Sequence, residues 1–164
     1  MWTYIPELIA RPVPRYTSYP TAMEFSDAVG GAQLAAALDG VAQDADVSLY
    51  VHIPFCEKIC WYCGCNTGAA GRRQRLSDYV EALKAEITMA ARRLQGRARV
   101  QRIAFGGGSP NAMAPIEFIR LLDHITTLFD VHQADISVEI DPRGFGPEWA
   151  LVMGAAGVSR ASFG

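Results

Sequence analysis

The sequence predicts an α/β chain that forms part of a parallel β/α barrel, with about four strands and an extended N-terminal arm. Three observations predict this fold class. Strands with one polar face alternate with helical segments from residue 47 onward, four of the nine prolines fall in the first twenty residues, and the 164 residues are too few for a complete eight-unit barrel of about 250. We therefore expect an arm and short helix over 1–46 and the first part of a barrel, truncated, over 47–164.

The first part of the chain carries little periodicity. Its prolines indicate an extended arm over 2–30, and a short helix is expected over 32–38. Residues 47–53 alternate with period two, so that Leu49, Val51 and Ile53 share one face. Tyr50 and His52 lie on the other face, which makes this a strand with one polar side.

The later elements repeat this pattern of strand and helix. Apolar residues at helical spacing between 76 and 94 predict an amphipathic helix of about five turns. Strand, helix, strand, helix and strand are then expected in that order over 100–105, 115–129, 135–140, 148–156 and 158–163. Strands joined by helices imply right-handed crossovers and a parallel sheet.

The polar alternation favours a barrel over a doubly wound sheet. In 136–140 the residues Ile136, Val138 and Ile140 share a face, and Glu139 lies on the other. Helices on both faces of a sheet would favour nearly continuous apolar strands instead. In a curved sheet with helices outside, Tyr50, His52 and Glu139 would point into one cavity.

Composition excludes several classes of partner. The formal charge is −2, and the chain lacks any run of Lys and Arg, so neither nucleic acid nor an anionic membrane surface is an expected partner. No stretch approaches the roughly 18 apolar residues of a membrane span, and the first residues lack the apolar core of a secretory signal. We therefore expect a cytoplasmic protein.

All four cysteines lie within ten residues, which favours a metal over a disulfide framework. The segment Cys56-x-x-x-Cys60-x-x-Cys63-x-Cys65 begins where a strand ends, and thiolates are the ligands that iron-sulfur clusters require. A structural zinc site usually has two ligand pairs set well apart. A ferredoxin site usually has spacings of two, two and three residues. Both stay open as alternatives to the cluster.

A glycine-rich segment, Gly106-Gly-Gly-Ser-Pro110, follows the second strand of the barrel. By itself such a run is often only a turn. Here it comes one strand-helix-strand unit after the cysteines, where the backbone must approach a ligand closely or take positive φ. Its spacing is neither that of a dinucleotide fingerprint nor that of a P-loop.

Together these motifs resemble the radical S-adenosylmethionine (radical SAM) superfamily. The resemblance implies a barrel of the radical SAM type in which three cysteines hold a [4Fe-4S] cluster. The fourth iron would bind S-adenosylmethionine, which is then cleaved to a 5'-deoxyadenosyl radical that abstracts hydrogen.

Five longer strings resemble one family, the oxygen-independent coproporphyrinogen III oxidases. They are PRYTSYPTA at 14–22, YVHIPFC at 50–56, CGCN at 63–66, GGGSP at 106–110 and EIDPR at 139–143. The resemblance implies oxidative decarboxylation of two propionates of coproporphyrinogen III to vinyl groups, which gives protoporphyrinogen IX for haem synthesis. It also implies a tetrapyrrole substrate and an electron donor such as a flavodoxin or ferredoxin.

The same resemblance assigns roles to individual residues. Cys56, Cys60 and Cys63 would bind the cluster, whereas Cys65 is characteristic of the family without being a ligand. Residues expected at the cluster-bound S-adenosylmethionine are Tyr50, Gly107 and Glu139. Residues expected at a second S-adenosylmethionine are Tyr62, Gly108 and Ser109, where serine stands in place of the family's usual threonine.

Three other hypotheses about the function remain alongside that of a coproporphyrinogen III oxidase. They are a haem chaperone of the same superfamily, a nonfunctional truncated product, and a zinc-binding interaction module. His124 and His132 have no metal partner nearby in the sequence and are assigned to the surface. Arg15 and Arg143 are candidates for contact with substrate carboxylates.

Overall fold

The structure is a computed structural model that describes residue 6 and residues 21–61, 63–65, 67–69, 71 and 73–164. The chain divides into two compact units, Met1–Ala36 and Ala37–Gly164. In the first, a 3₁₀ turn covers Ala22–Glu24 and helix α2 (Gly31–Asp39) begins. The helix predicted over 32–38 is thus confirmed, with one more residue at each end. The predicted division of the chain at residue 46 stays a prediction.

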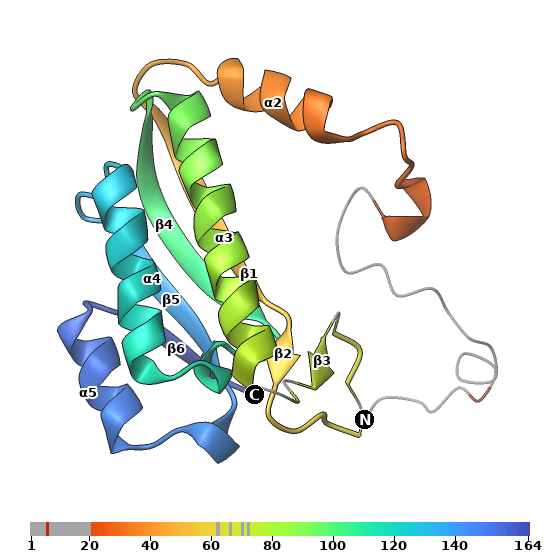
Figure 1. The fold of residues 1–164 in the computed structure, drawn as a ribbon, viewed down its shortest axis with the longest axis vertical. Helices are drawn as coiled ribbons and strands as arrows, with labels where there is room; N and C mark the ends of the chain where they lie inside the picture. The colour runs from red at the N-terminus through yellow and green to blue at the C-terminus, as the bar shows by residue number, and fades with distance from the viewer. Residues whose placement is uncertain (1–5, 7–20, 62, 66, 70, 72) are drawn as a thin grey trace. The chain divides into compact units, whose positions relative to one another are not determined.

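The second unit contains every strand and helix predicted for the barrel, and Figure 1 traces them in chain order. Its strands are β1 (Ala45–Ile53), β2 (Phe55–Cys56), β3 (Gly68–Ala69), β4 (Ala98–Gly107), β5 (Asp135–Ile140) and β6 (Arg160–Phe163). Its helices are α3 (Arg73–Leu94), α4 (Pro115–Leu128) and α5 (Pro147–Ala155), with 3₁₀ turns η2 (Pro110–Ala112) and η3 (Pro142–Gly144).

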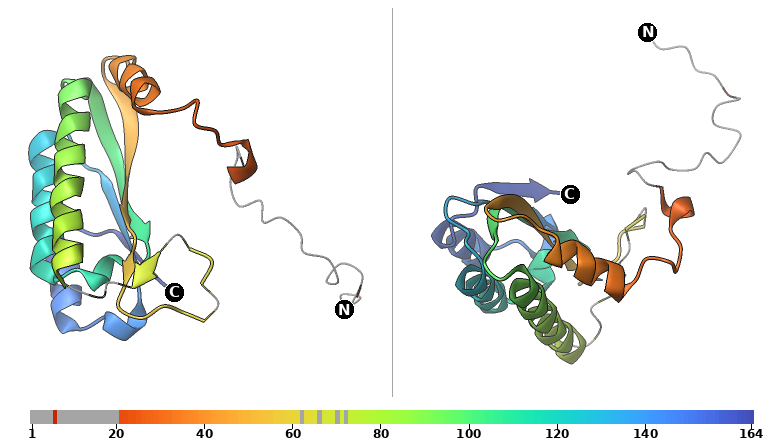
Figure 2. Two further views of the ribbon diagram at one scale, coloured as in Figure 1. Left: turned by 45° about the vertical axis from the view of Figure 1, so that its right-hand side comes forward. Right: turned by 90° about the horizontal axis from the view of Figure 1, so that it is seen from above.

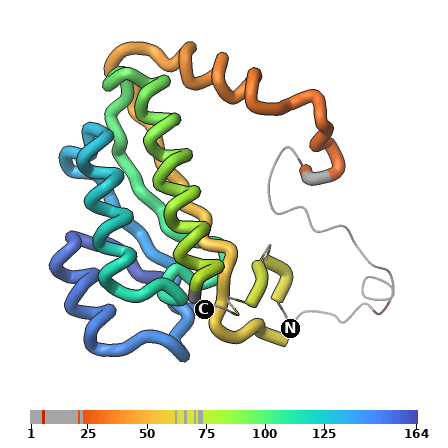
Figure 3. The backbone as a smooth tube through the Cα atoms, in the orientation of Figure 1, coloured from red at the N-terminus to blue at the C-terminus, as the bar shows by residue number. Residues whose placement is uncertain are grey.

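The main sheet has the order β1-β4-β5-β6, and all its strands are parallel. Helices α3, α4 and α5 lie along one face of it, as the left view of Figure 2 shows. Each strand therefore pairs with the one that precedes it across a helical crossover, as predicted for a partial barrel. Figure 3 follows the same path along the backbone. The two-stranded sheet of β2 and β3 was not predicted.

The alternation read from the sequence matches the two faces of the sheet. Val51, Ile103 and Val138 are buried on the face toward the helices. Tyr50 is 62% exposed on the opposite face, and Glu139 is exposed there as well. The polar face of the strands is thus the face that α3, α4 and α5 leave open.

Helix α4 supplies the centre of the core. Its buried residues Phe118, Leu121, Leu122 and Ile125 have the spacing of one helical face. The Phe118 side chain is fully buried, and its ring centroid lies 5.0 Å from that of Phe105 and 5.4 Å from that of Trp149. It therefore joins α4 to both the sheet and α5.

The surface assignment of His124 is wrong. This residue is half-buried, and its Nε2 lies 3.0 Å from Thr88 Oγ1 and 3.1 Å from the carbonyl oxygen of Lys84. The imidazole therefore links α4 to α3, a role that its position on a helix could not reveal. His132 is exposed, as predicted. In the described part of the chain no helix combines the length and apolar character needed to cross a bilayer.

Candidate functional site

The predicted site residues meet where β1, β4 and β5 end. His52 pairs with Gly106, and Ile53 with Gly107, in the register of β1 and β4. The register of β4 and β5 brings Glu139 beside the same glycines. Parallel strands place their carboxyl ends at one edge of a sheet, and this edge is where ligands of such sheets usually bind.

Tyr50 and His52 form a polar pair on the open face of β1. The Tyr50 hydroxyl and His52 Nδ1 are 3.0 Å apart, and the two ring centroids are 5.7 Å apart. The pKa of Tyr50 is raised, first by partial burial and then by the negative charge of Glu139. The side chains of Tyr50 and Glu139 thus share one electrostatic environment, as the alternation of the strands predicted.

Two glycines make room for these side chains. A Cβ atom on Gly106 would lie 2.8 Å from Glu139 Oε2 and 3.2 Å from Tyr50 Cε2. Gly107 has φ of +112°, and a Cβ there would lie 2.6 Å from His52 Cε1. Its backbone N–H donates to Glu139 Oε2 at 3.3 Å. Gly107 requires glycine because of its positive φ and its closeness to the His52 ring, whereas a side chain at Gly106 would have to displace the end of the Glu139 side chain.

Gly108 and Ser109 join the glycine-rich segment to the residues just before the cysteine loop, which we define as 56–65. The Gly108 N–H donates to the carbonyl of Ile53 and the Ser109 N–H to that of Phe55, both at 2.8 Å. The Ser109 side chain is buried, and its hydroxyl donates to Asn111 Oδ1. The Ser109 hydroxyl therefore points into the interior, and the Ser109 backbone N–H points toward Phe55, just before the loop.

Replacing Gly108 with alanine is expected to lower the free energy of unfolding by about 1–3 kcal/mol, because overpacking costs this much. The new Cβ would lie 2.5 Å from Thr67 Oγ1 and 2.7 Å from the carbonyl oxygen of Phe55, and a backbone atom cannot move aside cheaply. Urea denaturation followed by circular dichroism measures the effect.

Gly154→Ala is the matched control, since nothing lies within 4 Å of a Cβ at this position in α5. Alanine in a helix is favoured over glycine by about 1 kcal/mol, so this variant should be as stable as the parent or more so. Equal urea midpoints for the two variants would contradict the close approach at Gly108.

The cysteine loop starts at the end of β2. Cys56 is buried, and its Sγ lies 3.3 Å from Thr67 Oγ1, whose hydroxyl donates to the carbonyl of Pro54 at 3.1 Å. Cys60 is half-buried, and the Cys63 N–H donates to its carbonyl at 3.1 Å. All four cysteines are free thiols, with Cys63 and Cys65 exposed. The loop is thus anchored at its first cysteine and open at its last two.

Arg143 connects this loop to the end of β5. Its Nε donates to both carboxylate oxygens of Asp141, and its Nη2 donates to Cys60 Sγ at 3.3 Å. Hydrogen bonding from Arg143 lowers the pKa of Asp141. The sequence offered Arg143 for a substrate carboxylate, whereas in the structure its guanidinium contacts a carboxylate and a thiol of this chain.

The four thiols are donors of the kind that an iron-sulfur cluster requires, but in this structure they do not lie together around one point. Among the described residues, which include all four cysteines, no three His, Cys, Asp or Glu side chains are close enough together to hold a metal ion. The pKa of Cys65 is raised, first by loss of hydration and then by the Cys63 thiol, so these two lie near each other.

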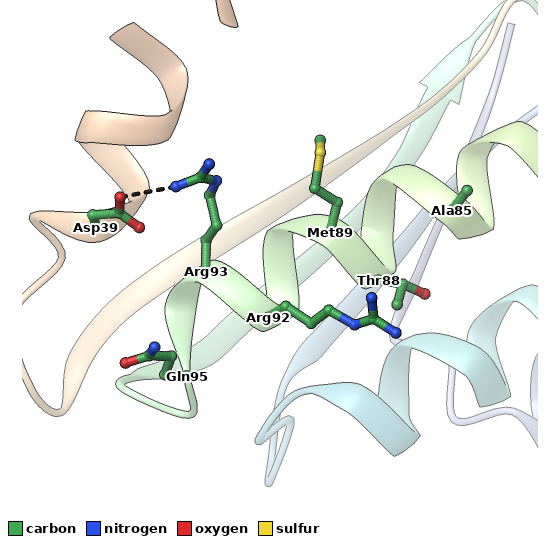
Figure 4. A pocket seen from close by; sticks show the side chains of 7 residues that line it. All are labelled: Asp39, Ala85, Thr88, Met89, Arg92, Arg93 and Gln95. Carbon is green, nitrogen blue, oxygen red and sulfur yellow. Dashed lines mark hydrogen bonds and ion pairs between the residues drawn. The ribbon is translucent and has the colours of Figure 1, made fainter. Parts of the chain in front are cut away.

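Two of the grooves in the described part of the chain differ in their distance from the predicted site. One of about 600 Å³ runs along the open face of the sheet below Tyr50. Its lining residues are Ser48, Leu49, Tyr50, Arg102, Ala104, Asp135, Ser137, Ser159 and Arg160. Figure 4 shows the other, of about 510 Å³, near the carboxyl end of α3, where Arg93 pairs with Asp39 at 2.9 Å. The cysteine loop precedes the opposite end of α3, so of these two grooves the one below Tyr50 adjoins the predicted site.

Tyr62 and most of the 14–22 motif lie outside the described residues, so their predicted roles stay predictions. The sequence reasoning passed over Thr67 and Asn111, which hold the cysteine loop and the end of β5. Asn111 directly follows the glycine-rich segment, which was a usable signal. Thr67 offered no signal beyond its nearness to Cys65.

Sequence comparison relates the chain to known proteins. A model of the radical SAM superfamily matches residues 50–164. An oxygen-independent coproporphyrinogen III oxidase of Bradyrhizobium diazoefficiens is 42% identical over 153 residues, covering 93% of this chain and 34% of that protein. The enzyme of the same name from Escherichia coli is 39% identical, covering 92% of this chain and 33% of that protein.

The structural comparison agrees with the sequence comparison. A solved structure described as coproporphyrinogen III oxidase from Escherichia coli, a radical SAM enzyme, matches with a TM-score of 0.82 and 33% identity. The match covers 98% of this chain and 36% of that one. The chain thus spans about a third of the length of the curated relatives that it matches.

Proposed function

Because this chain belongs to the radical SAM superfamily, we propose that it forms the cluster-binding part of an oxygen-independent coproporphyrinogen III oxidase. The observation that carries the proposal is that the residues leading into the cysteine loop meet the glycine-rich end of β4, through the bonds of Gly108 and Ser109 to Ile53 and Phe55. A site for a cluster and its ligand needs both segments at one edge of the sheet.

Cys56, Cys60 and Cys63 are the proposed ligands of a [4Fe-4S] cluster. Their thiolates are soft donors within one short loop, and the loop starts at a strand end. Cys65 lies just beyond, and we propose that it is not a ligand.

Tyr50, Gly107 and Glu139 are the proposed contacts of the S-adenosylmethionine bound at the cluster. The carboxylate of Glu139 suits an ammonium group, and Gly107 exposes backbone at the same place. Tyr62, Gly108 and Ser109 are the proposed contacts of a second S-adenosylmethionine.

When bound, the cluster and S-adenosylmethionine would supply a radical that abstracts a hydrogen atom from a carbon of the substrate. The residues of this chain orient the reactants. Gly106 and Gly107 let Tyr50, His52 and Glu139 lie close over the strand end, and the polar groove along the sheet continues from Tyr50. Orientation of this kind, with exclusion of water, is the protein's share of cofactor chemistry.

The proposed substrate is coproporphyrinogen III. Each of two propionate groups would give a hydrogen atom to the radical that S-adenosylmethionine supplies and an electron to an electron acceptor, and would release carbon dioxide, which leaves a vinyl group. The reducing electron would come from a donor such as a flavodoxin or ferredoxin, and we propose a cytoplasmic location. The remaining two thirds of the relatives' length would be required for the complete activity.

A chimera tests this proposal. Replacing the matching segment of the Bradyrhizobium diazoefficiens oxidase with this chain should leave anaerobic formation of protoporphyrinogen IX within about tenfold of the parent, the loss of about 1.4 kcal/mol in transition-state stabilisation. The same chimera with Glu139→Gln should lose most of this activity.

Two results would count against the proposal. A chimera that folds and takes up iron but forms no product would contradict the assignment to this oxidase. Haem binding without turnover by the same chimera would instead indicate a haem chaperone.

A further inference from the structure

The contacts of Arg143 differ from the role that the sequence predicted for it, which was contact with a substrate carboxylate. We propose that Arg143 is a positioning residue that holds the cysteine loop against the end of β5 and, through its hydrogen bond to Cys60 Sγ, raises the reduction potential of the bound cluster. The inference rests on the proposed function, because it presupposes that a cluster binds at Cys60.

The guanidinium group joins two segments that are far apart in the sequence. On one side it forms a forked pair with Asp141, with Nε donating to Oδ1 at 2.9 Å and Nη2 to Oδ2 at 2.6 Å. On the other side Nη2 donates to the carbonyl of Lys58 at 2.9 Å and to Cys60 Sγ at 3.3 Å. Nη2 has two hydrogens for these three acceptors, so at least one hydrogen is shared.

Asp141 is itself held firmly. Its backbone N–H donates to Asn111 Oδ1, and its carbonyl accepts from Asn111 Nδ2, both at 2.9 Å. Asn111 is only 5% exposed, and its Oδ1 also accepts from the Ser109 hydroxyl. The glycine-rich segment, the end of β5 and the cysteine loop are therefore joined by one continuous set of hydrogen bonds.

The cation of this set contacts Cys60, and its anionic partner Asp141 lies on the other side of the guanidinium group. Arg143 is a permanent cation, because a guanidinium group stays protonated in proteins. Among the described residues, the side-chain hydrogen bond of Cys56 is with the neutral hydroxyl of Thr67. Of the three proposed ligands, Cys60 therefore has the charged donor.

A cationic donor on a ligand sulfur favours the reduced cluster. Reduction adds a negative charge, which is spread over the iron and sulfur atoms, and hydrogen bonds to the sulfurs are among the determinants of the potential. Charge-assisted hydrogen bonds are about twice as strong as neutral ones. Removal of Arg143 should thus make the cluster harder to reduce.

The test compares variants of the 164-residue chain after anaerobic reconstitution with iron and sulfide. Iron per chain is measured first, and the midpoint potential is then followed by electron paramagnetic resonance. Arg143→Gln removes the charge and the fork, and Arg143→Lys keeps the charge alone. Arg99→Gln is the matched control, since Arg99 is an exposed arginine that pairs with exposed Asp46 on β1 at 3.6 Å.

We expect the Arg99→Gln potential to equal that of the parent, Arg143→Gln to shift to a more negative value, and Arg143→Lys to fall between them. A potential for Arg143→Gln equal to that of the parent would overturn the inference. If Arg143→Gln takes up too little iron for titration, the comparison is made with Arg143→Lys, and a parental potential in that variant would be equally decisive. A parent chain that binds no cluster would instead contradict the proposed function.

Discussion

Cys60→Ser is expected to abolish the iron-sulfur cluster and, in the chimera, to reduce product formation by more than about 100-fold, since even outer-shell partners of metal ligands can matter by 10–100-fold. A serine hydroxyl has nearly the shape of the thiol but is a hard ligand with a much higher pKa, so it does not replace a thiolate on iron. Cys60 is also the thiol that Arg143 contacts, and its substitution therefore removes a ligand and a loop contact together.

The measurement is iron and sulfide per chain after anaerobic reconstitution, together with the absorbance of a cubane cluster. Cys65→Ser is the matched control, because this thiol lies in the same loop and is not a proposed ligand. It should take up as much iron as the parent. The reverse pattern, with iron lost from Cys65→Ser and kept in Cys60→Ser, would disprove the ligand assignment. Bound zinc in place of iron would indicate a structural site.

Phe118→Ala should lower the free energy of unfolding by about 3–5 kcal/mol, as is usual when a buried aromatic ring is removed. The ring is fully buried between those of Phe105 on β4 and Trp149 on α5. Its loss would leave a cavity where the sheet and two helices meet. Since small domains are stable by only about 5–15 kcal/mol, much of the chain's stability would be lost.

Ile116→Ala is the control for this change, because Ile116 lies on the same helix and is 55% exposed. Surface substitutions usually change stability by less than about 0.5 kcal/mol, so its urea midpoint should stay close to that of the parent. A urea midpoint for Phe118→Ala that is also close to that of the parent would mean that α4 does not supply the centre of the core.

The strands and helices of the barrel could be predicted because each carries its own local pattern. The alternation of Leu49, Val51 and Ile53 with polar residues reports both the strand and the face that is buried. The residues at which the strands begin and end were harder to predict. β4 continues through Gly107, although glycines interrupt the pattern, because backbone pairing with His52 and Ile53 needs no side chain. β2 and β3 have two residues each, too few for any periodicity.

The candidate site was predictable where its chemistry is local in sequence and not where it is made by distant contacts. The cysteine loop and glycine-rich segment are short strings, and the structure brings them together. By contrast, the contact of Arg143 with Lys58 and Cys60 depends on how the end of β5 is held by Asn111. His124 likewise depends on the packing of α4 against α3. Neither the contacts of Arg143 nor those of His124 produce a periodic pattern in the sequence.

The order of the main sheet follows the order of its strands along the chain, with a consequence for how the protein is made. β4 pairs with β1, β5 with β4, and β6 with β5, so the partner of each new strand has already left the ribosome when that strand emerges. Each pairing closes a loop about the size of one helical crossover, and loop-closure entropy is modest at that length. The sheet can therefore assemble during synthesis, strand by strand from the amino-terminal side.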